Sequence, residues 1–430
     1  MTRRTRSASA AAIGLCVALV AAGCAGGDGG GGASSDGQGT VTLWTNAMEG
    51  RGAQYWKDAA KAYRALHPDV TIKIQSVQNE DLDGKLQNAL NSNSAPDIFL
   101  QRGGGKMQAM VEAGQIQSLE LTGTDRENVG EAALEGVSID GKVYAMPLDT
   151  QPEGIYYSKD LFKQAGITST PTTMDGLKDA VAKLKAIGVA PIAVGAKDAW
   201  PAAHWYYNFV VRECSQETMQ KAAKSLTFDD PCWAEAGDDL AVLLKEQPFQ
   251  KGFLTATSQQ GAGSSAGMIA NHRAAMELMG NWEPGVVRDL TPQKKPLADL
   301  GWFPFPAVPG GQGDPTAIMG GAGGYSLSRN APKEALSFLQ FVVTKEQQES
   351  YAQAFDTVPV NKKAQGVVTE SYNISALETF NKAAYSMQFL DTVYGQNVGN
   401  AMNIAVVNLM AGKGSASDIV ADVKAAAEKG

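Results

Sequence analysis

Short apolar segments alternate with helical patterns from residue 40 onward, and this alternation constrains the architecture more than any other feature. Residues 41–44 and 97–100 are short and apolar, while residues 70–74 alternate apolar and polar side chains, as a half-buried strand does. Residues 53–66 and 82–90 carry apolar side chains at helical spacing. Strands that alternate with helices of this length form parallel sheets. The sequence therefore predicts an α/β architecture.

Aromatic and polar residues stand where two of these strands end. Trp44 ends the first strand and Asn46 follows it, while Gln101 and Arg102 follow the third. Ligands of open α/β sheets bind outside the carboxyl ends of the strands. We therefore expect these residues at one rim of the sheet.

The alternation starts again in the second part of the chain. Residues 142–147 predict a strand that leads into a crossover at residues 148–150, and residues 274–279 predict a further strand. The last stretch, residues 375–429, is mostly helical in pattern. About 390 residues follow position 39, which suits two lobes better than one domain.

The first 39 residues predict export rather than folding. Three arginines precede an apolar run over residues 10–22, which is shorter than the roughly 20 residues that span a bilayer. We expect a signal peptide over residues 1–23. Small residues before Cys24 resemble a bacterial lipobox, which implies a lipidated Cys24 and a glycine-rich tether over residues 24–39. Ordinary secretion and an uncleaved anchor are the alternatives, and both Sec and twin-arginine export stay open.

Charge and cysteines exclude several classes of function. The net charge is −8 and no dense basic block follows the leader, which argues against nucleic acid and anionic membrane surfaces as partners. Cys214 and Cys232 remain after the leader, and we expect a disulfide between them. Two buried free thiols or a metal site are the alternatives. Neither cysteine belongs to a C-x-x-C pair and no histidine lies nearby, so we expect no metal and no cofactor.

Several segments, in their order along the chain, resemble the extracellular solute-binding proteins of family 1, the maltose-binding-protein-like sugar receptors of ABC importers. They include "VTLWT", "APDIFL", "MELMGNWEPG" and "VPVNKKA", and the resemblance runs from residue 41 to the end. It implies a type II periplasmic-binding-protein-like fold, with hinged lobes around a central cleft. Lobe 1 would hold residues 40–147 and 301–358, and lobe 2 residues 150–300 and 359–430. The glycine-rich tether resembles those of actinobacterial members.

The resemblance also implies a function. We expect a non-enzymatic, monomeric receptor, lipid-anchored at the outer face of the cell membrane, that delivers an oligosaccharide to the permease subunits. Similarity to actinobacterial members favours xylobiose or another xylo-oligosaccharide; cellobiose, maltose-type sugars and chitobiose are the alternatives. A secreted glycoside hydrolase built on Asp149 and Glu283, or an anchored adhesin, would be a different class of protein. The match of residues 263–267 to G-x-S-x-G lacks the preceding strand of a nucleophile elbow, so we expect no catalytic residue.

Sugar sites need flat aromatic rings for C–H faces and fixed polar groups for hydroxyls. Trp282 is the strongest stacking candidate, because the family commonly stacks a sugar just after this strand. Core packing is the alternative for each of the other aromatic candidates, which are Trp44, Trp200, His204 and Trp205. The polar candidates stand near strand ends or the crossover, with solvated loop positions as the alternative; they are Asn46, Glu49, Gln101, Arg102, Asp149, Gln151, Glu283 and Asp391.

Overall fold

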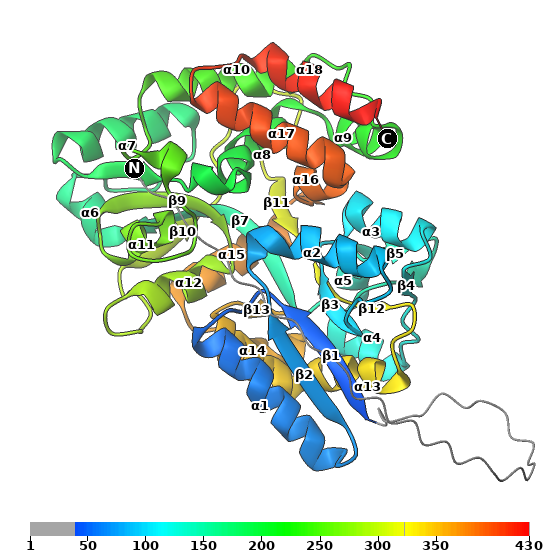
Figure 1. Ribbon diagram of the computed structural model, residues 1–430. Helices are drawn as coiled ribbons and strands as arrows, with labels where there is room; N and C mark the ends of the chain where they lie inside the picture. Colours follow the sequence, from blue (N-terminus) through cyan, green and yellow to red (C-terminus); the bar gives the residue numbers. More distant parts are fainter. Residues whose placement is uncertain (1–38, 322, 430) are drawn as a thin grey trace, which may run out of the picture. The chain divides into compact units, whose positions relative to one another are not determined.

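Two β-sheets organise the chain (Figure 1), and the computed structural model describes residues 39–321 and 323–429. The first sheet has the strand order β2-β1-β3-β12-β4. Its strands are β1 (Thr40–Thr45), β2 (Thr71–Ser76), β3 (Ile98–Gln101), β4 (Ile116–Gln117) and β12 (Gly324–Ser328). Strand β1 runs parallel to both β2 and β3, so the parallel sheet predicted for the start of the chain is confirmed.

The first sheet buries its core against amphipathic helices. Helix α1 (Gly50–Leu66) turns Trp56, Ala59 and Tyr63 inward, since residues three and four apart share one helix face. The indole of Trp56 packs edge-on against Tyr325 of β12, with ring centroids 4.9 Å apart. The other elements of this lobe are α2 (Asn79–Asn91), α3 (Gly104–Glu112), α4 (Gly123–Val129), α5 (Glu131–Glu135), β5 (Ser138–Ile139), β6 (Lys142–Val143), α13 (Lys333–Val342) and α14 (Lys345–Phe355).

The second sheet is built around one long strand, β7 (Asp149–Ser158). It pairs along its length with β9 (Ala274–Gly280), β10 (Leu300–Phe303), β11 (Ile318–Gly321) and β13 (Val358–Pro359). Strand β8 (Ala190–Ala193) pairs with β9, and β14 (Ser386–Met387) pairs with β11. The partners of β7 are antiparallel to it, whereas β8 runs parallel to β9 and β14 runs parallel to β11, so this sheet is mixed.

Helix α8 (Trp200–Glu213) is the central helix of the second lobe and is buried on nearly every side. It packs against α10 (Cys232–Lys245) and α17 (Gly395–Met410). A disulfide joins Cys214 to Cys232 and ties the end of α8 to the start of α10, so the predicted pairing is confirmed. The remaining helices are α6 (Lys159–Gln164), α7 (Met174–Ala186), α9 (Gln216–Ser225), α11 (Ser265–Ala270), α12 (Glu283–Leu290), α15 (Ser371–Lys382), α16 (Leu390–Val393) and α18 (Ala416–Ala427), with short 3-10 turns at Ala196–Asp198, Phe253–Thr255 and Lys362–Val367.

The strand pairing shows where the chain passes between the two sheets. Strand β7 begins the second sheet at Asp149, close to the predicted crossover. The expected return near residue 301 differs from the pairing, because β10 and β11 both pair with β7 and keep residues 300–321 on the second sheet. The chain enters the first sheet only at β12. The lobe boundaries given above stay a prediction.

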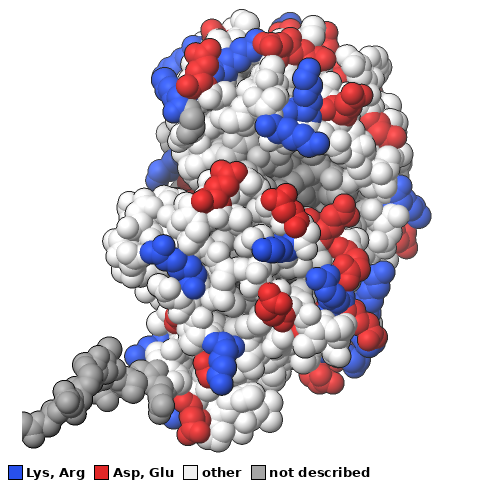
Figure 2. All heavy atoms as spheres, turned by 90° about the vertical axis from the view of Figure 1, so that its right-hand side faces the viewer, with Lys and Arg blue, Asp and Glu red and all other residues white. Residues whose placement is uncertain are grey.

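Three further points concern the surface charge, membrane-spanning helices and the N-terminal leader. On the face that Figure 2 shows, lysine and arginine side chains are interspersed with aspartate and glutamate side chains. Among residues 39–321 and 323–429, no helix combines the length and the apolar character that crossing a membrane requires. The predicted signal peptide, the tether and the lipidation of Cys24 lie outside the described residues.

Candidate functional site

Four aromatic rings of the second lobe form a closed circuit, which we call the aromatic cluster: Trp200, His204, Trp282 and Phe389. Trp200 lies 5.0 Å from His204 and 6.1 Å from Trp282, measured between ring centroids. Phe389 completes the circuit, 4.7 Å from His204 and 5.7 Å from Trp282. Trp200, Trp282 and Phe389 are half-buried, whereas His204 is buried. The cluster therefore offers ring surface to a ligand while one member anchors it.

Local backbone geometry places these rings. Trp200 and His204 stand four residues apart at the start of α8, so they share one helix face. Trp282 follows β9 and folds back over Gly280, where an added Cβ would lie only 2.2 Å from the indole ring. A glycine is therefore required for the indole to lie against the strand end.

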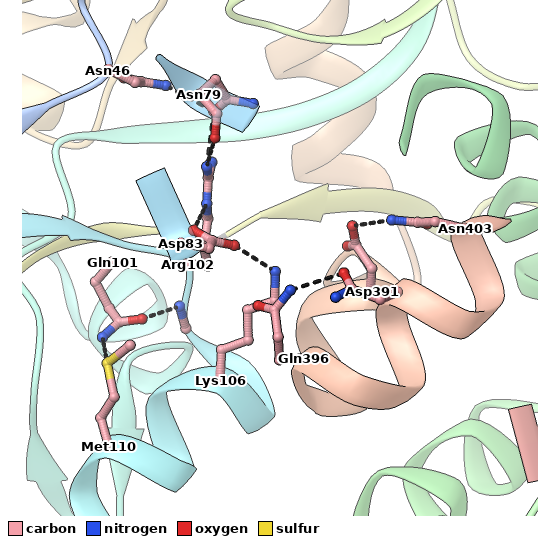
Figure 3. Close-up of polar contacts among 12 residues, drawn as sticks. Asn46, Asn79, Asp83, Gln101, Arg102, Lys106, Met110, Asp391, Gln396 and Asn403 are labelled. Carbon is pink, nitrogen blue, oxygen red and sulfur yellow. Dashed lines mark hydrogen bonds and ion pairs between the residues drawn. The ribbon is translucent and has the colours of Figure 1, made fainter. Parts of the chain in front are cut away.

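A second group of side chains gathers at the rim of the first sheet (Figure 3), and we call it the polar cluster: Asn46, Asn79, Asp83, Arg102 and Lys106. The Asn79 side-chain oxygen accepts from Asn46 at 3.2 Å and from the Arg102 guanidinium at 2.8 Å. Asp83 accepts from Arg102 at 3.3 Å and from Lys106 at 2.8 Å. Helix α2 supplies Asn79 and Asp83 one turn apart, and the end of β3 supplies Arg102. The strand ends thus gather hydrogen-bonding groups at one rim, as the sequence predicts for Asn46 and Arg102.

The charges of the polar cluster fix the ionisation of Asp83. Burial opposes ionisation of this carboxyl group, but the neighbouring Arg102 and Lys106 outweigh it and lower the pKa of Asp83 from 3.8 to about 2. The carboxylate therefore stays ionised at any physiological pH. One of its ion pairs holds the Arg102 side chain, and the other holds that of Lys106.

Replacing Asp83 with asparagine is expected to lower the free energy of unfolding by about 1 kcal/mol at pH 7, after allowing for partial exposure of the pair. A carboxyl group with a lowered folded-state pKa stabilises the fold above the unfolded pKa of 3.8, and this contribution is lost as pH falls toward 2. Urea titrations at pH 7 and at pH 3 should therefore show a smaller difference at pH 3. Asp81→Asn is the matched control, because its ion pair with Lys85 is exposed; an equal loss from both variants would contradict the expectation.

One segment touches both clusters. The Gln388 amide donates to the backbone oxygen of Arg102 at 2.7 Å, and the next residue is Phe389 of the aromatic cluster. A Cβ added at Gly104, at the start of α3, would lie 2.8 Å from the backbone oxygen of Thr392. Residues 388–392 therefore join the polar rim of the first lobe to the aromatic cluster of the second, and we take the region between the clusters as the candidate site.

Three of the predicted residues lie near this region without belonging to a cluster. Gln151 of β7 donates to Asp149 at 3.2 Å, and Tyr351 donates to the same carboxylate at 3.1 Å. Burial raises the pKa of Asp149 to about 6. Asp391, at the start of α16, accepts from Asn403 at 3.2 Å and is half-buried. These carboxylates already have protein partners.

Four other predicted residues lie outside the two clusters, and their role in ligand binding stays a prediction. Trp205 is completely buried in the core of the second lobe, between Phe249 and Phe305, because its position on α8 points away from Trp200. Trp44 is half-buried against the core of the first lobe, and Glu49 is exposed. Gln101 is buried and accepts from the backbone N–H of Gly103 at 3.1 Å at the start of α3.

Glu283 also differs from the expectation, because its carboxyl group is fully buried beside that of Glu277. Burial raises the pKa of Glu277 to about 7, and burial together with the neighbouring Glu277 raises the pKa of Glu283 well above its ordinary range. Two carboxyl groups this close avoid carrying two charges. Burial therefore disfavours the ionised form of Glu283, whose carboxyl group is enclosed in the protein rather than exposed.

Sequence reasoning missed Phe389, Asn79 and Asp83. Phe389 lies two residues before Asp391, in a segment with no strand end to mark it. Asn79 and Asp83 stand four residues apart around the start of the helix predicted for residues 82–90, and this spacing was their only local signal. Within the described part of the chain, no group of three or more histidine, cysteine, aspartate or glutamate residues is arranged to hold a metal ion.

Comparison with known proteins assigns the fold and the family. The diacetylchitobiose binding protein DasA of Streptomyces coelicolor is 25% identical over 363 residues, which cover 82% of this chain and 80% of the relative. The multiple sugar-binding protein of Streptococcus mutans is 26% identical over 343 residues, covering 77% and 76%.

Solved structures agree. A protein studied for xylan utilization by the thermophilic bacterium Caldanaerobius polysaccharolyticus matches with a TM-score of 0.82 at 25% identity, covering 90% of this chain and 99% of that one. A chitin oligosaccharide binding protein matches with a TM-score of 0.79 at 24% identity, covering 91% and 98%. The predicted two-lobed type II fold is confirmed. Residues 15–349 match the family described as bacterial extracellular solute-binding protein, and the chain therefore belongs to that family.

Proposed function

We propose that this protein is the extracellular sugar-binding receptor of an ABC importer and that it captures an oligosaccharide between its two lobes. The carrying observation is the aromatic cluster, whose three half-buried rings include Phe389, the residue next to Gln388, and Gln388 donates to Arg102 at a strand end of the other lobe. Aromatic faces match the C–H faces of a sugar, and amide, guanidinium and carboxylate groups match its hydroxyls. Relatives named for sugars and for ABC transporters support the same reading.

Capture would follow from closure of the lobes. Besides the bond from Gln388 to Arg102, Gln260 donates to Gln78, at the start of α2. A sugar that touches both clusters binds the closed arrangement more tightly than the open one, and this difference in affinity shifts the population toward closure. The closed form would then dock on the permease subunits.

A xylo-oligosaccharide such as xylobiose is our preferred ligand. Two tryptophans and a phenylalanine in one circuit offer more ring surface than a single sugar unit covers, which favours two or more units. The match to a protein of xylan utilization supports the choice of xylose units. Chitobiose, cellobiose and maltose-type sugars are the alternatives, and DasA and the chitin oligosaccharide binding protein favour the first of these.

We further propose that the receptor is a monomer, held at the outer face of the cell membrane by lipid on Cys24. Mass analysis of the mature N-terminus tests the anchor, since a diacylated cysteine and an unmodified signal-peptidase product differ in mass. The tether over residues 24–39 would let the lobes reach the permease while the lipid prevents loss by diffusion.

Calorimetric titration with xylobiose, cellobiose, maltose and chitobiose tests the function. We expect saturable one-to-one binding of at least one of them, with xylobiose the tightest. No saturable binding across the panel would contradict the receptor. Overnight incubation with the corresponding oligosaccharides tests the hydrolase alternative, and release of shorter products would overturn the proposal. Glu283 is fully buried, and it therefore lacks the exposure that a nucleophile or a general acid requires.

A further inference from the structure

A buried carboxylate lies directly behind the aromatic cluster. Glu153 stands in the middle of β7 and is only 1% exposed. One of its oxygens bonds to Nδ1 of His204, and the other accepts from the side-chain amide of Asn208 at 2.6 Å. Asn208 also donates to the backbone oxygen of His204 at 3.0 Å. Strand β7 and helix α8 are thus tied together at this one carboxylate.

This bond fixes which way the His204 ring faces. A carboxylate only accepts hydrogen bonds, so the proton lies on Nδ1. Nε2 has no hydrogen-bond partner among residues 39–321 and 323–429. The ring stacks on Phe389 with an angle of 12° between the two planes. Its plane and its tautomer are therefore set by a group that no ligand would touch.

The contacts run outward in a series. Glu153 holds His204, the imidazole of His204 supports the ring of Phe389, and Phe389 packs against Trp282 at 5.7 Å. Each ring in this series is more exposed than the carboxylate behind it. An aromatic platform supported in this way is fixed before a ligand arrives, which reduces the ordering cost of binding.

We propose that Glu153 is a positioning residue for sugar binding: it acts through His204 to hold the rings of Phe389 and Trp282 in place and to leave Nε2 for a sugar hydroxyl. This inference rests on the proposed function. Under this proposal, Glu153 contributes to sugar affinity although it is buried in β7 and does not contact the sugar. Loss of the carboxylate would free the ring of His204 to rotate and change tautomer, since glutamine can donate to Nδ1 as well as accept from it.

A double-mutant cycle tests the proposal. Calorimetry would use xylobiose, or whichever of the four disaccharides the wild type binds most tightly, with wild type, Glu153→Gln, His204→Phe and the double variant. We expect Glu153→Gln to weaken binding about tenfold in the wild-type background and by less than about twofold in the His204→Phe background, because residues that act as a unit are not additive. Equal weakening in both backgrounds would overturn the proposal, and so would unchanged affinity in Glu153→Gln.

A second measurement does not depend on the variants folding. Nitrogen-15 NMR of histidine-labelled wild-type protein reports the tautomer of His204, one of three histidines in the chain. We expect the proton on Nδ1, and a signal from protonated Nε2 with bare Nδ1 would contradict the proposal.

Glu213→Gln is the matched control for the affinity measurements. Glu213 is also a buried glutamate of this lobe, but it lies at the opposite end of α8, so the sugar affinity of this variant should equal that of the wild type.

The outcomes separate the two proposals. If the wild type binds no sugar of the panel, the proposed function fails. If the wild type binds and the cycle is additive, the receptor stands and only the role of Glu153 is wrong.

Discussion

Replacing Trp282 with alanine is expected to weaken oligosaccharide binding about 100-fold, which corresponds to about 2.7 kcal/mol. In the proposed site the indole would offer its own face to the sugar, and it packs against both Trp200 and Phe389. Its removal therefore takes away one stacking surface and leaves two neighbouring rings unsupported. Calorimetric titration of the variant with the disaccharide that the wild type binds most tightly measures the loss.

Phe253→Ala is the control for this variant. Phe253 is a half-buried aromatic residue of the same lobe, but it packs on Phe249 rather than on the aromatic cluster. Its loss should change the melting temperature without changing the sugar affinity by more than about twofold. A folded Trp282→Ala protein that binds as tightly as the wild type would remove Trp282 from the site, and with it the observation on which the proposed function depends.

Removing the disulfide is expected to lower the free energy of unfolding by about 3 kcal/mol. Cys214 and Cys232 are both fully buried and lie 18 residues apart, so the bond closes a loop that would otherwise gain freedom in the unfolded chain. Urea denaturation of a Cys214→Ala, Cys232→Ala double variant measures the difference from wild type, provided that the slope of the transition is unchanged.

Reduction gives the control for that experiment. A thiol reductant should lower the stability of the wild type toward that of the double variant and leave the double variant unaffected. Sugar affinity should be nearly unchanged at 25 °C, because Trp200 and His204 stand at the other end of α8. A double variant as stable as the wild type would mean that the bond adds no net stability.

Periodicity was enough to predict the first three strands of the first lobe and the helices that follow them. The helix predicted over residues 53–66 is α1, which begins three residues earlier, and the strand predicted over residues 97–100 is β3, shifted by one residue. Local patterns succeed for β1, β2 and β3 because a helix follows each of these strands directly and β1 pairs with both of the others. Other pairings follow no such order, since β13 pairs with β7, and β12 with β3, across more than 200 residues of chain.

The residues of the candidate site also fall into those that the sequence could predict and those that it could not. Trp282 and Arg102 could be proposed from the sequence, because a strand end marks each of them. The sequence does not distinguish Trp200 from Trp205 as a stacking candidate. The packing of α8 does, because two residues five positions apart on an α-helix point to nearly opposite sides. Glu283 looked like an exposed carboxylate beside a tryptophan, yet it is enclosed against Glu277, which lies six positions earlier on β9.

The sequence by itself determined the α/β class, the strand ends at which polar residues gather, and the pairing of Cys214 with Cys232, because these depend on local periodicity and on a short list of candidates. Tertiary structure alone decided which aromatic rings meet. Phe389 reaches Trp282 across more than a hundred residues of chain, and Glu153 reaches His204 from another strand. Such contacts depend on how the helices pack on the sheet, and a local sequence pattern does not predict that packing.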